Sequence, residues 1–273
     1  MIKYSLRGAG IRPFFVLKFQ PMFDSPLTLI LLFVSALLAG TMDTIAGGGG
    51  IITVPVLFNF ISEPLQVFGT NKFQSSFGSF SATLNFFKEK KYSLKLVWGV
   101  IFTAIGSFAG AYCVGIIPSN ILRKFVPIML YAIAIFLLSY KNYGLKKQER
   151  KRLDEKIFFC IFGLSIGFYD GFFGPGTGTF WAILFVHFLG LDLKEATINT
   201  KLMNFTSNII PLIFFLSKGA VLFLPGSAMA LGQVIGGYIG SKIVLKKGAK
   251  LIKPILISIS LILATKLFFD NLL

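Results

Sequence analysis

Long apolar segments recur along this chain, and they constrain its fold more than any other feature. Runs such as 27–39, 96–117 and 251–263 approach or reach the roughly 20 residues that cross a bilayer as a helix. The chain of 273 residues is 55% hydrophobic and only 14% charged, and a soluble core cannot hide so many apolar runs. The sequence therefore predicts an all-α integral membrane protein.

Two series of helical spans are expected, one on each side of a polar stretch. In the first half they lie at about 27–45, 51–62, 71–88, 94–116 and 120–140. In the second half they lie at about 157–172, 178–190, 197–217, 220–244 and 251–269. The segments beside the glycines are short, so each of those pairs forms either two full crossings or one broken or re-entrant segment, which gives about eight to ten transmembrane segments.

This pattern divides the chain into a first transmembrane repeat at 22–140, a linker at 141–156 and a second transmembrane repeat at 157–273. The linker holds seven basic residues against three acids, a density that predicts a cytoplasmic linker in a multi-pass protein of the plasma (inner) membrane. The lead at 1–21 is basic and has no pattern. Two interpretations of it stay open: a loose or interfacial segment, or a true start of translation at Met22.

Glycines interrupt the apolar runs at two places, each a few residues after an aspartate. Glycine inside a helix costs about 1 kcal/mol against alanine, so both places predict a broken helix. In lipid, a broken helix is tolerated only where its free backbone groups face protein or a water-filled cavity. Free N–H groups at the start of a half-helix carry partial positive charge, which suits an anion. The glycines are Gly47, Gly48, Gly49 and Gly50 after Asp43, and Gly174, Gly176 and Gly178 after Asp170.

The alternative for any membrane glycine is close packing of helices through small residues. That interpretation is favoured for the GxxxG pairs Gly106/Gly110 and Gly232/Gly236.

The two halves repeat one order of residues, which indicates an internal duplication typical of secondary transporters. Basic loops change sides between the halves. The loop after the third span is rich in lysine only in the first half, and the loop after the fourth is richer in the second. This exchange predicts inverted repeats whose two glycine segments meet across one cavity. The matching residues are Gly40, Asp43, Gly47 and Gly49 with Gly167, Asp170, Gly174 and Gly176, then Lys72 with Lys201.

A polar corner with a lysine follows each glycine segment, at 69–74 and at 198–204. Each corner is expected to open a helix, with Thr70 or Asn199 as the N-cap. A lysine in the first turn opposes the helix dipole, and an anionic ligand is one candidate for compensation. The alternative is a lysine that reaches the headgroups or pairs with an acid.

Asp43 and Asp170 are candidates for proton coupling, because acids inside a membrane are costly and mark functional sites. Their alternative roles are to cap the next helix or to pair with Lys72 or Lys201. Asn85, Asn204 and Asn208 are further polar groups within spans; each either lines a path or joins helices by hydrogen bonds.

Several functional classes find no support in the sequence. The formal net charge is +16, but the basic residues lie in short loops, which fits membrane topology rather than nucleic-acid binding. Cys113, Cys160 and His187 show no metal, redox or catalytic spacing. The sequence therefore predicts no enzyme, cofactor or metal site.

The first-half segment 40–57, followed by Gly69-Thr70-Asn71-Lys72, resembles the signature of the TauE/SafE family of membrane permeases. The echo at 167–178 with Asn199-Thr200-Lys201 resembles it more loosely. The resemblance implies a transporter of sulfite, thiosulfate or organosulfonates. Because Pro175 and Thr177 stand where the first segment has glycines, it does not imply a symmetrical site.

We therefore expect a secondary transporter that moves a small anion by alternating access, with proton coupling as an option. An anion channel, a transporter of a different small solute and a non-transporting membrane interaction protein are the alternatives. The expected partners are the anion and the lipid bilayer, and the sequence is compatible with a homo-oligomer. The expected substrate-binding residues are Gly47, Gly48, Gly49, Gly50, Thr53, Asn71, Lys72, Gln74, Gly174, Gly176, Thr177, Gly178, Asn199, Thr200, Lys201 and Asn204.

Overall fold

The structure is a computed structural model that describes residues 23, 25–89, 96–139 and 153–247. Within these residues every regular element is a helix. The expected span at 251–269, the lead at 1–21 and residues 141–152 of the linker lie outside the described residues.

The described helices follow the two predicted series. The first half forms α1 (Pro26–Ala46), α2 (Gly50–Phe58), α3 (Pro64–Glu89), α4 (Leu96–Ile116) and α5 (Ser119–Ser139). The second half forms α6 (Glu155–Phe158), the π-helical turn η2 (Phe159–Gly163), α7 (Leu164–Phe172), α8 (Thr177–Leu189), α9 (Leu193–Ser217) and α10 (Phe223–Lys247).

Helices α3 and α9 begin earlier than the sequence pattern predicts, and this places both polar corners in helix interiors. Helix α3 begins at Pro64, whose missing N–H is harmless at the first helical position. Helix α9 follows Asp192, whose carboxylate accepts a hydrogen bond from the N–H of Glu195 at 2.8 Å. The prediction that Thr70 or Asn199 caps these helices is therefore wrong.

Three of the described helices are long and apolar enough to cross a membrane: Pro26–Ala46, Leu96–Ile116 and Phe223–Lys246. Each carries large apolar side chains on its outer face; Ile30, Ile105 and Leu231 are all more than half exposed. Exposed apolar surface on this scale is unfavourable in water and suits contact with lipid. The architecture is that of a helical membrane protein.

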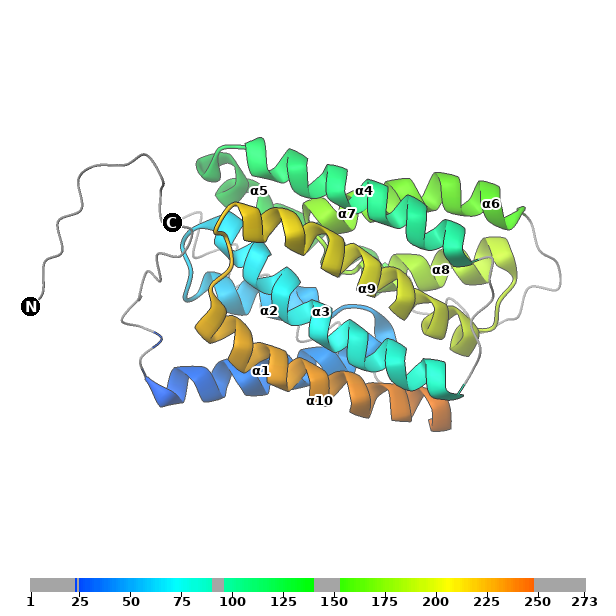
Figure 1. The fold of residues 1–273 in the computed structure, drawn as a ribbon, viewed down its shortest axis with the longest axis horizontal. Coiled ribbons are helices and arrows are strands. Elements are labelled where there is room, and N and C mark those ends of the chain that lie inside the picture. The colour runs from blue at the N-terminus through cyan, green and yellow to red at the C-terminus, as the bar shows by residue number, and fades with distance from the viewer. Residues whose placement is uncertain (1–22, 24, 90–95, 140–152, 248–273) are drawn as a thin grey trace, which may run out of the picture.

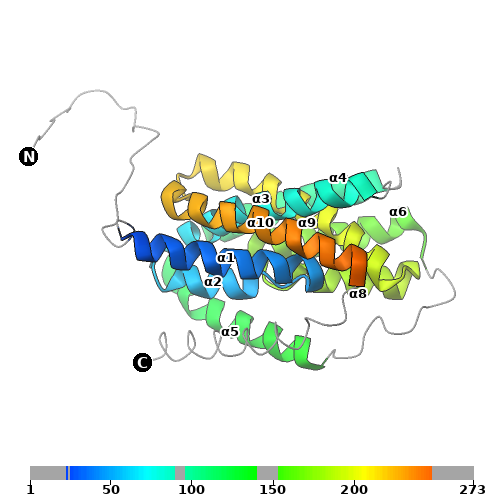
Figure 2. The ribbon, with the colours of Figure 1, turned by 90° about the horizontal axis from the view of Figure 1, so that it is seen from below.

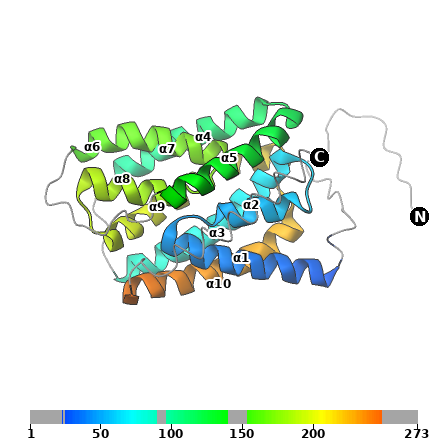
Figure 3. The ribbon, with the colours of Figure 1, turned by 180° about the vertical axis from the view of Figure 1, so that it is seen from behind.

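The helices form a row in the order α1, α10, α3, α9, α4 and α7, in which each packs on the next (Figure 1). Helix α10 from the second half lies between α1 and α3, and α4 from the first half lies between α9 and α7. Each half of the chain therefore places one helix, α4 or α10, among the helices of the other half. Figure 2 and Figure 3 show α2, α8 and α5 on one face of this row.

Glycines bring the exchanged helices α4 and α10 into backbone contact with α7 and α1. At four glycines a Cβ atom would collide with a carbonyl oxygen of the adjacent helix. The packing interpretation of the two GxxxG pairs is thus confirmed, and the α4–α7 and α10–α1 contacts are built alike. The collisions pair Gly106 with Leu164 and Gly110 with Phe168 on the first contact, and Gly232 with Phe33 and Gly236 with Leu37 on the second.

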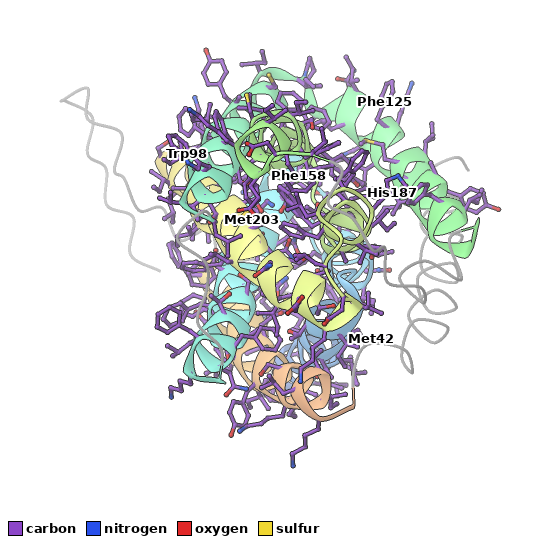
Figure 4. The ribbon with its side chains drawn as sticks, turned by 90° about the vertical axis from the view of Figure 1, so that its right-hand side faces the viewer. Met42, Trp98, Phe125, Phe158, His187 and Met203 are labelled. Carbon is purple, nitrogen blue, oxygen red and sulfur yellow. The ribbon has the colours of Figure 1, made fainter. Side chains whose placement is uncertain are left out.

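An aromatic cluster fixes the outer part of α8. Trp181 and Phe185 on α8 stack with ring centroids 5.3 Å apart, and both pack on Phe158 at the end of α6. Phe158 and Met203 lie in the interior, whereas Phe125 on α5 lies at the periphery (Figure 4). The cluster packs α8 on α6, and the first turn of α8, from Thr177 to Thr179, is buried.

Candidate functional site

Two short irregular segments separate paired helices: 47–49 lies between α1 and α2, and 173–176 lies between α7 and α8. Gly47, Gly174 and Gly176 have φ angles of 79°, 96° and 83°, which L side chains rarely adopt. The N–H of Gly47 donates to the carbonyl of Asp43 at 2.8 Å and closes the end of α1. Both segments therefore need glycine where the chain leaves its first helix.

The two segments lie in direct contact. The N–H of Thr179 donates to the carbonyl of Gly47 at 3.2 Å, and the Thr179 hydroxyl donates to the carbonyl of Ala46 at 2.6 Å. A Cβ at Gly47 would collide with the backbone of Gly178. The end of α1 and the segment after it thus lie against the start of α8.

A small cavity lies beside this contact. Its volume is about 30 Å³, and a buried water needs roughly 10–15 Å³ of such space. The cavity admits about two water molecules, so any larger solute requires the helices to move. Its lining residues come from both halves of the chain: Asp43, Gly47, Gly49, Gly50, Asn71, Lys72, Ser75, Asp170, Gly174, Gly176, Thr177, Gly178, Asn204, Asn208 and Gln233.

Two ion pairs at the cavity cross between the halves. Lys72 Nζ on α3 donates to Asp170 Oδ1 on α7 at 2.7 Å, and the two side chains are 3% and 6% exposed. Lys201 Nζ on α9 donates to Asp43 Oδ2 on α1, also at 2.7 Å. The lysine of each half thus binds the carboxylate of the other half, and the four formal charges cancel.

The Lys72–Asp170 pair sits in a dense hydrogen-bond network. Lys72 Nζ also donates to the carbonyl of Ser207 at 3.1 Å and to Asn208 Oδ1 at 3.2 Å. The hydroxyl of Ser207 donates to Asp170 Oδ2. Both carboxylate oxygens and the ammonium group therefore have partners within the protein, as buried charges require.

Asp43 has a more open setting than Asp170. Its side chain is 25% exposed, against 6% for Asp170. Besides the bond to Lys201, its Oδ1 accepts the N–H of Gly49 at 3.0 Å, next to the start of α2. Asp43 therefore both caps the start of α2 and pairs with Lys201, two roles that the sequence presents as alternatives.

Two polar side chains behind the cavity wall bind Asn71, which lines the cavity. The Thr53 hydroxyl donates to Asn71 Oδ1 at 2.6 Å, and Gln74 Nε2 donates to the same oxygen at 2.8 Å. These two bonds hold the Asn71 amide in one orientation at the cavity.

The predicted site residues divide into those that line the cavity and those behind it. Thr53 and Gln74 contact Asn71, and Lys201 contacts Asp43, so these three act one contact away. Gly48, Asn199 and Thr200 do not line the cavity. The predicted residues in the lining are Gly47, Gly49, Gly50, Asn71, Lys72, Gly174, Gly176, Thr177, Gly178 and Asn204, together with Asp43 and Asp170.

Ser75, Ser207 and Gln233 were not predicted from the sequence as site residues. Ser75 lies one helical turn after Asn71, a spacing that gives a usable signal. Gln233 is a long polar side chain in a glycine-rich apolar helix, which is a second usable signal. Asn85, in contrast, donates to the Ser241 hydroxyl at 2.6 Å and joins α3 to α10.

Comparisons with known proteins agree with this architecture. A family model described as Sulfite exporter TauE/SafE matches residues 32–267. The "Probable membrane transporter protein YfcA" of Escherichia coli is 41% identical over 250 residues, which cover 90% of this chain and 92% of that protein. A "Probable membrane transporter protein" of Haemophilus influenzae is 35% identical over 244 residues, or 89% of this chain and 95% of that protein. No solved structure matches the chain significantly.

Proposed function

Because the chain belongs to the TauE/SafE family of membrane transporters, we propose that it is a secondary transporter of a small anion. The substrate class is sulfite, thiosulfate or an organosulfonate, moved across the plasma (inner) membrane by alternating access. The observation that carries the proposal is the cavity at which the starts of α2 and α8 meet two crossed lysine–aspartate pairs.

The helix starts favour an anion as the substrate. The first N–H groups of a helix have no partner within the helix and carry partial positive charge. The start of α2 already binds a negative group, because the Asp43 carboxylate accepts the N–H of Gly49. A sulfite or sulfonate group offers the same kind of oxygen to the same kind of donor.

The crossed ion pairs supply a route to proton coupling. While Asp43 and Asp170 are ionised, they neutralise Lys201 and Lys72. A proton on either carboxylate leaves the paired lysine with an uncompensated charge, and an incoming anion restores the balance. Proton and anion would then occupy the site together, which couples their movement.

Alternating access follows from inverted repeats in which α2 turns back beside α1 and α8 turns back beside α6–α7, as matching re-entrant pairs. The exchange of α4 and α10 between the halves and their matched glycine contacts support this arrangement. The cavity has room for about two water molecules, which is consistent with a closed state between two open ones. The linker at 141–156 is cytoplasmic in this topology.

Flux measurements in liposomes test the proposal. We expect saturable sulfite flux from the purified protein and a dependence of its rate on a pH gradient. Lys72→Ala and Lys201→Ala should each reduce flux per folded molecule by about 10- to 100-fold, as expected for a hydrogen bond to a charged group. The double variant should be inactive.

Lys218→Ala is the matched control, because Lys218 lies over the Phe214 ring and away from the cavity. Unchanged flux of sulfite, thiosulfate and sulfonates in the double lysine variant contradicts the role of the lysines. Absence of flux for all three in the wild type contradicts the proposed function, and flux that neither saturates nor responds to pH indicates a channel.

A further inference from the structure

Gln233 brings a buried amide to the cavity from α10. The residue is 3% exposed and lines the cavity, and its side chain makes no hydrogen bond to any residue that the structure describes. Buried polar side chains in proteins nearly always have a partner. An unpartnered amide at a cavity wall therefore points to a ligand.

Two glycines make space for this side chain. A Cβ at Gly40 on α1 would lie 2.7 Å from Gln233 Oε1, and a Cβ at Gly78 on α3 would collide with the same atom. Neither glycine has a positive φ angle, so backbone conformation does not require them. They are required because Gln233 passes between α1 and α3 to the cavity.

The charges beside Gln233 are already matched. Each lysine at the site has a carboxylate at 2.7 Å, so neutral donors are the first groups that an entering anion finds free. Asn204 on α9 also lines the cavity, but its atom without a partner among the described residues is Oδ1, which accepts hydrogen bonds and does not bind an anion.

The matching position in the first half does not share this arrangement. The alignment of Gly106 with Gly232 places Ser107 opposite Gln233 in the repeat. The Ser107 hydroxyl donates to the carbonyl of Ala104 in its own helix at 3.1 Å, and Ser107 does not line the cavity. The long amide is therefore a feature of one half only.

We propose that Gln233 contacts the substrate, with its side-chain amide donating a hydrogen bond to an oxygen of a small oxyanion. This inference rests on the proposed transport function and adds a residue that sets specificity within the same site. The ligand class is an anion with several accessible oxygens, such as sulfite or a sulfonate, rather than a halide.

The test compares two variants of Gln233 in liposome flux assays with sulfite and methanesulfonate. Gln233→Met keeps the length of the side chain and removes the amide, and we expect KM to rise about 3- to 10-fold, the value of one neutral hydrogen bond. Gln233→Glu keeps the shape and adds a negative charge, so KM should rise further near neutral pH.

A pH series with Gln233→Glu separates contact from a structural role. The KM for methanesulfonate, relative to wild type at each pH, should fall as the pH falls, because a protonated carboxyl donates a hydrogen bond as the amide does. Ser107→Ala is the matched control and should leave KM unchanged. Thermal unfolding of each variant confirms that folded protein is compared; if Gln233→Met does not fold, Gln233→Glu decides.

A wild-type KM in folded Gln233→Met overturns the inference while leaving the transport function intact. If Gln233→Met does not fold, a wild-type KM in Gln233→Glu at every pH has the same consequence. Absence of wild-type flux for both anions refutes the proposed function first and the inference with it. The wild-type measurement thus distinguishes the two failures.

Discussion

Lys72 Nζ and Asp170 Oδ1 lie 2.7 Å apart although 98 positions separate the residues along the chain. Lys201 and Asp43 form the reciprocal contact across 158 positions. In this arrangement each half supplies the opposite charge for the buried lysine and the aspartate of the other half. The exchange of α4 and α10 adds a second dependence, so the two halves are expected to fold as one unit.

Breaking the Lys72–Asp170 pair should cost more stability when one partner is removed than when both are replaced. Lys72→Met leaves the Asp170 carboxylate buried beside Ser207 without its cation, and removal of one partner of a buried pair typically costs about 3–5 kcal/mol. The double variant Lys72→Met/Asp170→Leu removes both charges and should recover part of the loss. Thermal unfolding in detergent measures this; strictly additive losses would show that the two side chains are not coupled.

The two aspartates should differ in how much they contribute to stability. Asp43 is 25% exposed, so solvent screens its pair with Lys201 more than it screens the buried Asp170 pair. Asn at position 43 also retains an oxygen that can accept the Gly49 N–H. We expect Asp43→Asn to lower the unfolding temperature less than Asp170→Asn. Equal losses in the same detergent would contradict this order.

Apolar length was enough to predict most of the helices. The expected spans at 27–45, 94–116 and 197–217 correspond to α1, α4 and the greater part of α9. The glycines at 47–50 and 174–178 were sufficient to predict where paired helices end and begin, because glycine in a helix interior is unfavourable and positive φ angles favour it. These are local properties, which a sequence carries directly.

The partners of the charged residues could not be predicted in the same way. The repeat places Asp43 and Lys72 in one half and Asp170 and Lys201 in the other, and nothing local indicates that each pair forms across the halves. That pairing depends on which helices adjoin in space. Gln233 carries a local signal, a long polar side chain in an apolar helix, but its approach to the cavity depends on Gly40 and Gly78 of two other helices.

Substitution of a glycine in the α4–α7 contact and in the α10–α1 contact should have the same effect on folding. A leucine at Gly110 would collide with the Phe168 carbonyl on α7, and one at Gly236 would collide with the Leu37 carbonyl on α1. We expect both variants to lose folded protein in the membrane, as judged by size-exclusion chromatography after detergent extraction. Tyr112→Leu is the control, because Tyr112 is 56% exposed on α4. A well-folded Gly110→Leu or Gly236→Leu would contradict the proposed backbone contact.

Gly47→Ala and Gly219→Ala separate backbone strain from the contact between the two glycine segments. Both glycines have positive φ angles, 79° and 62°, and a non-glycine residue there costs about 1–2 kcal/mol. Nothing lies within 4 Å of a Cβ at Gly219, so strain is the whole expected cost of that variant. At Gly47 the new Cβ also collides with the backbone of Gly178. We therefore expect Gly219→Ala to lower the unfolding temperature modestly and to retain flux. In Gly47→Ala the decrease in unfolding temperature should be several times larger, and flux should be lost. Similar unfolding temperatures for the two variants would show that the starts of α2 and α8 do not depend on this contact.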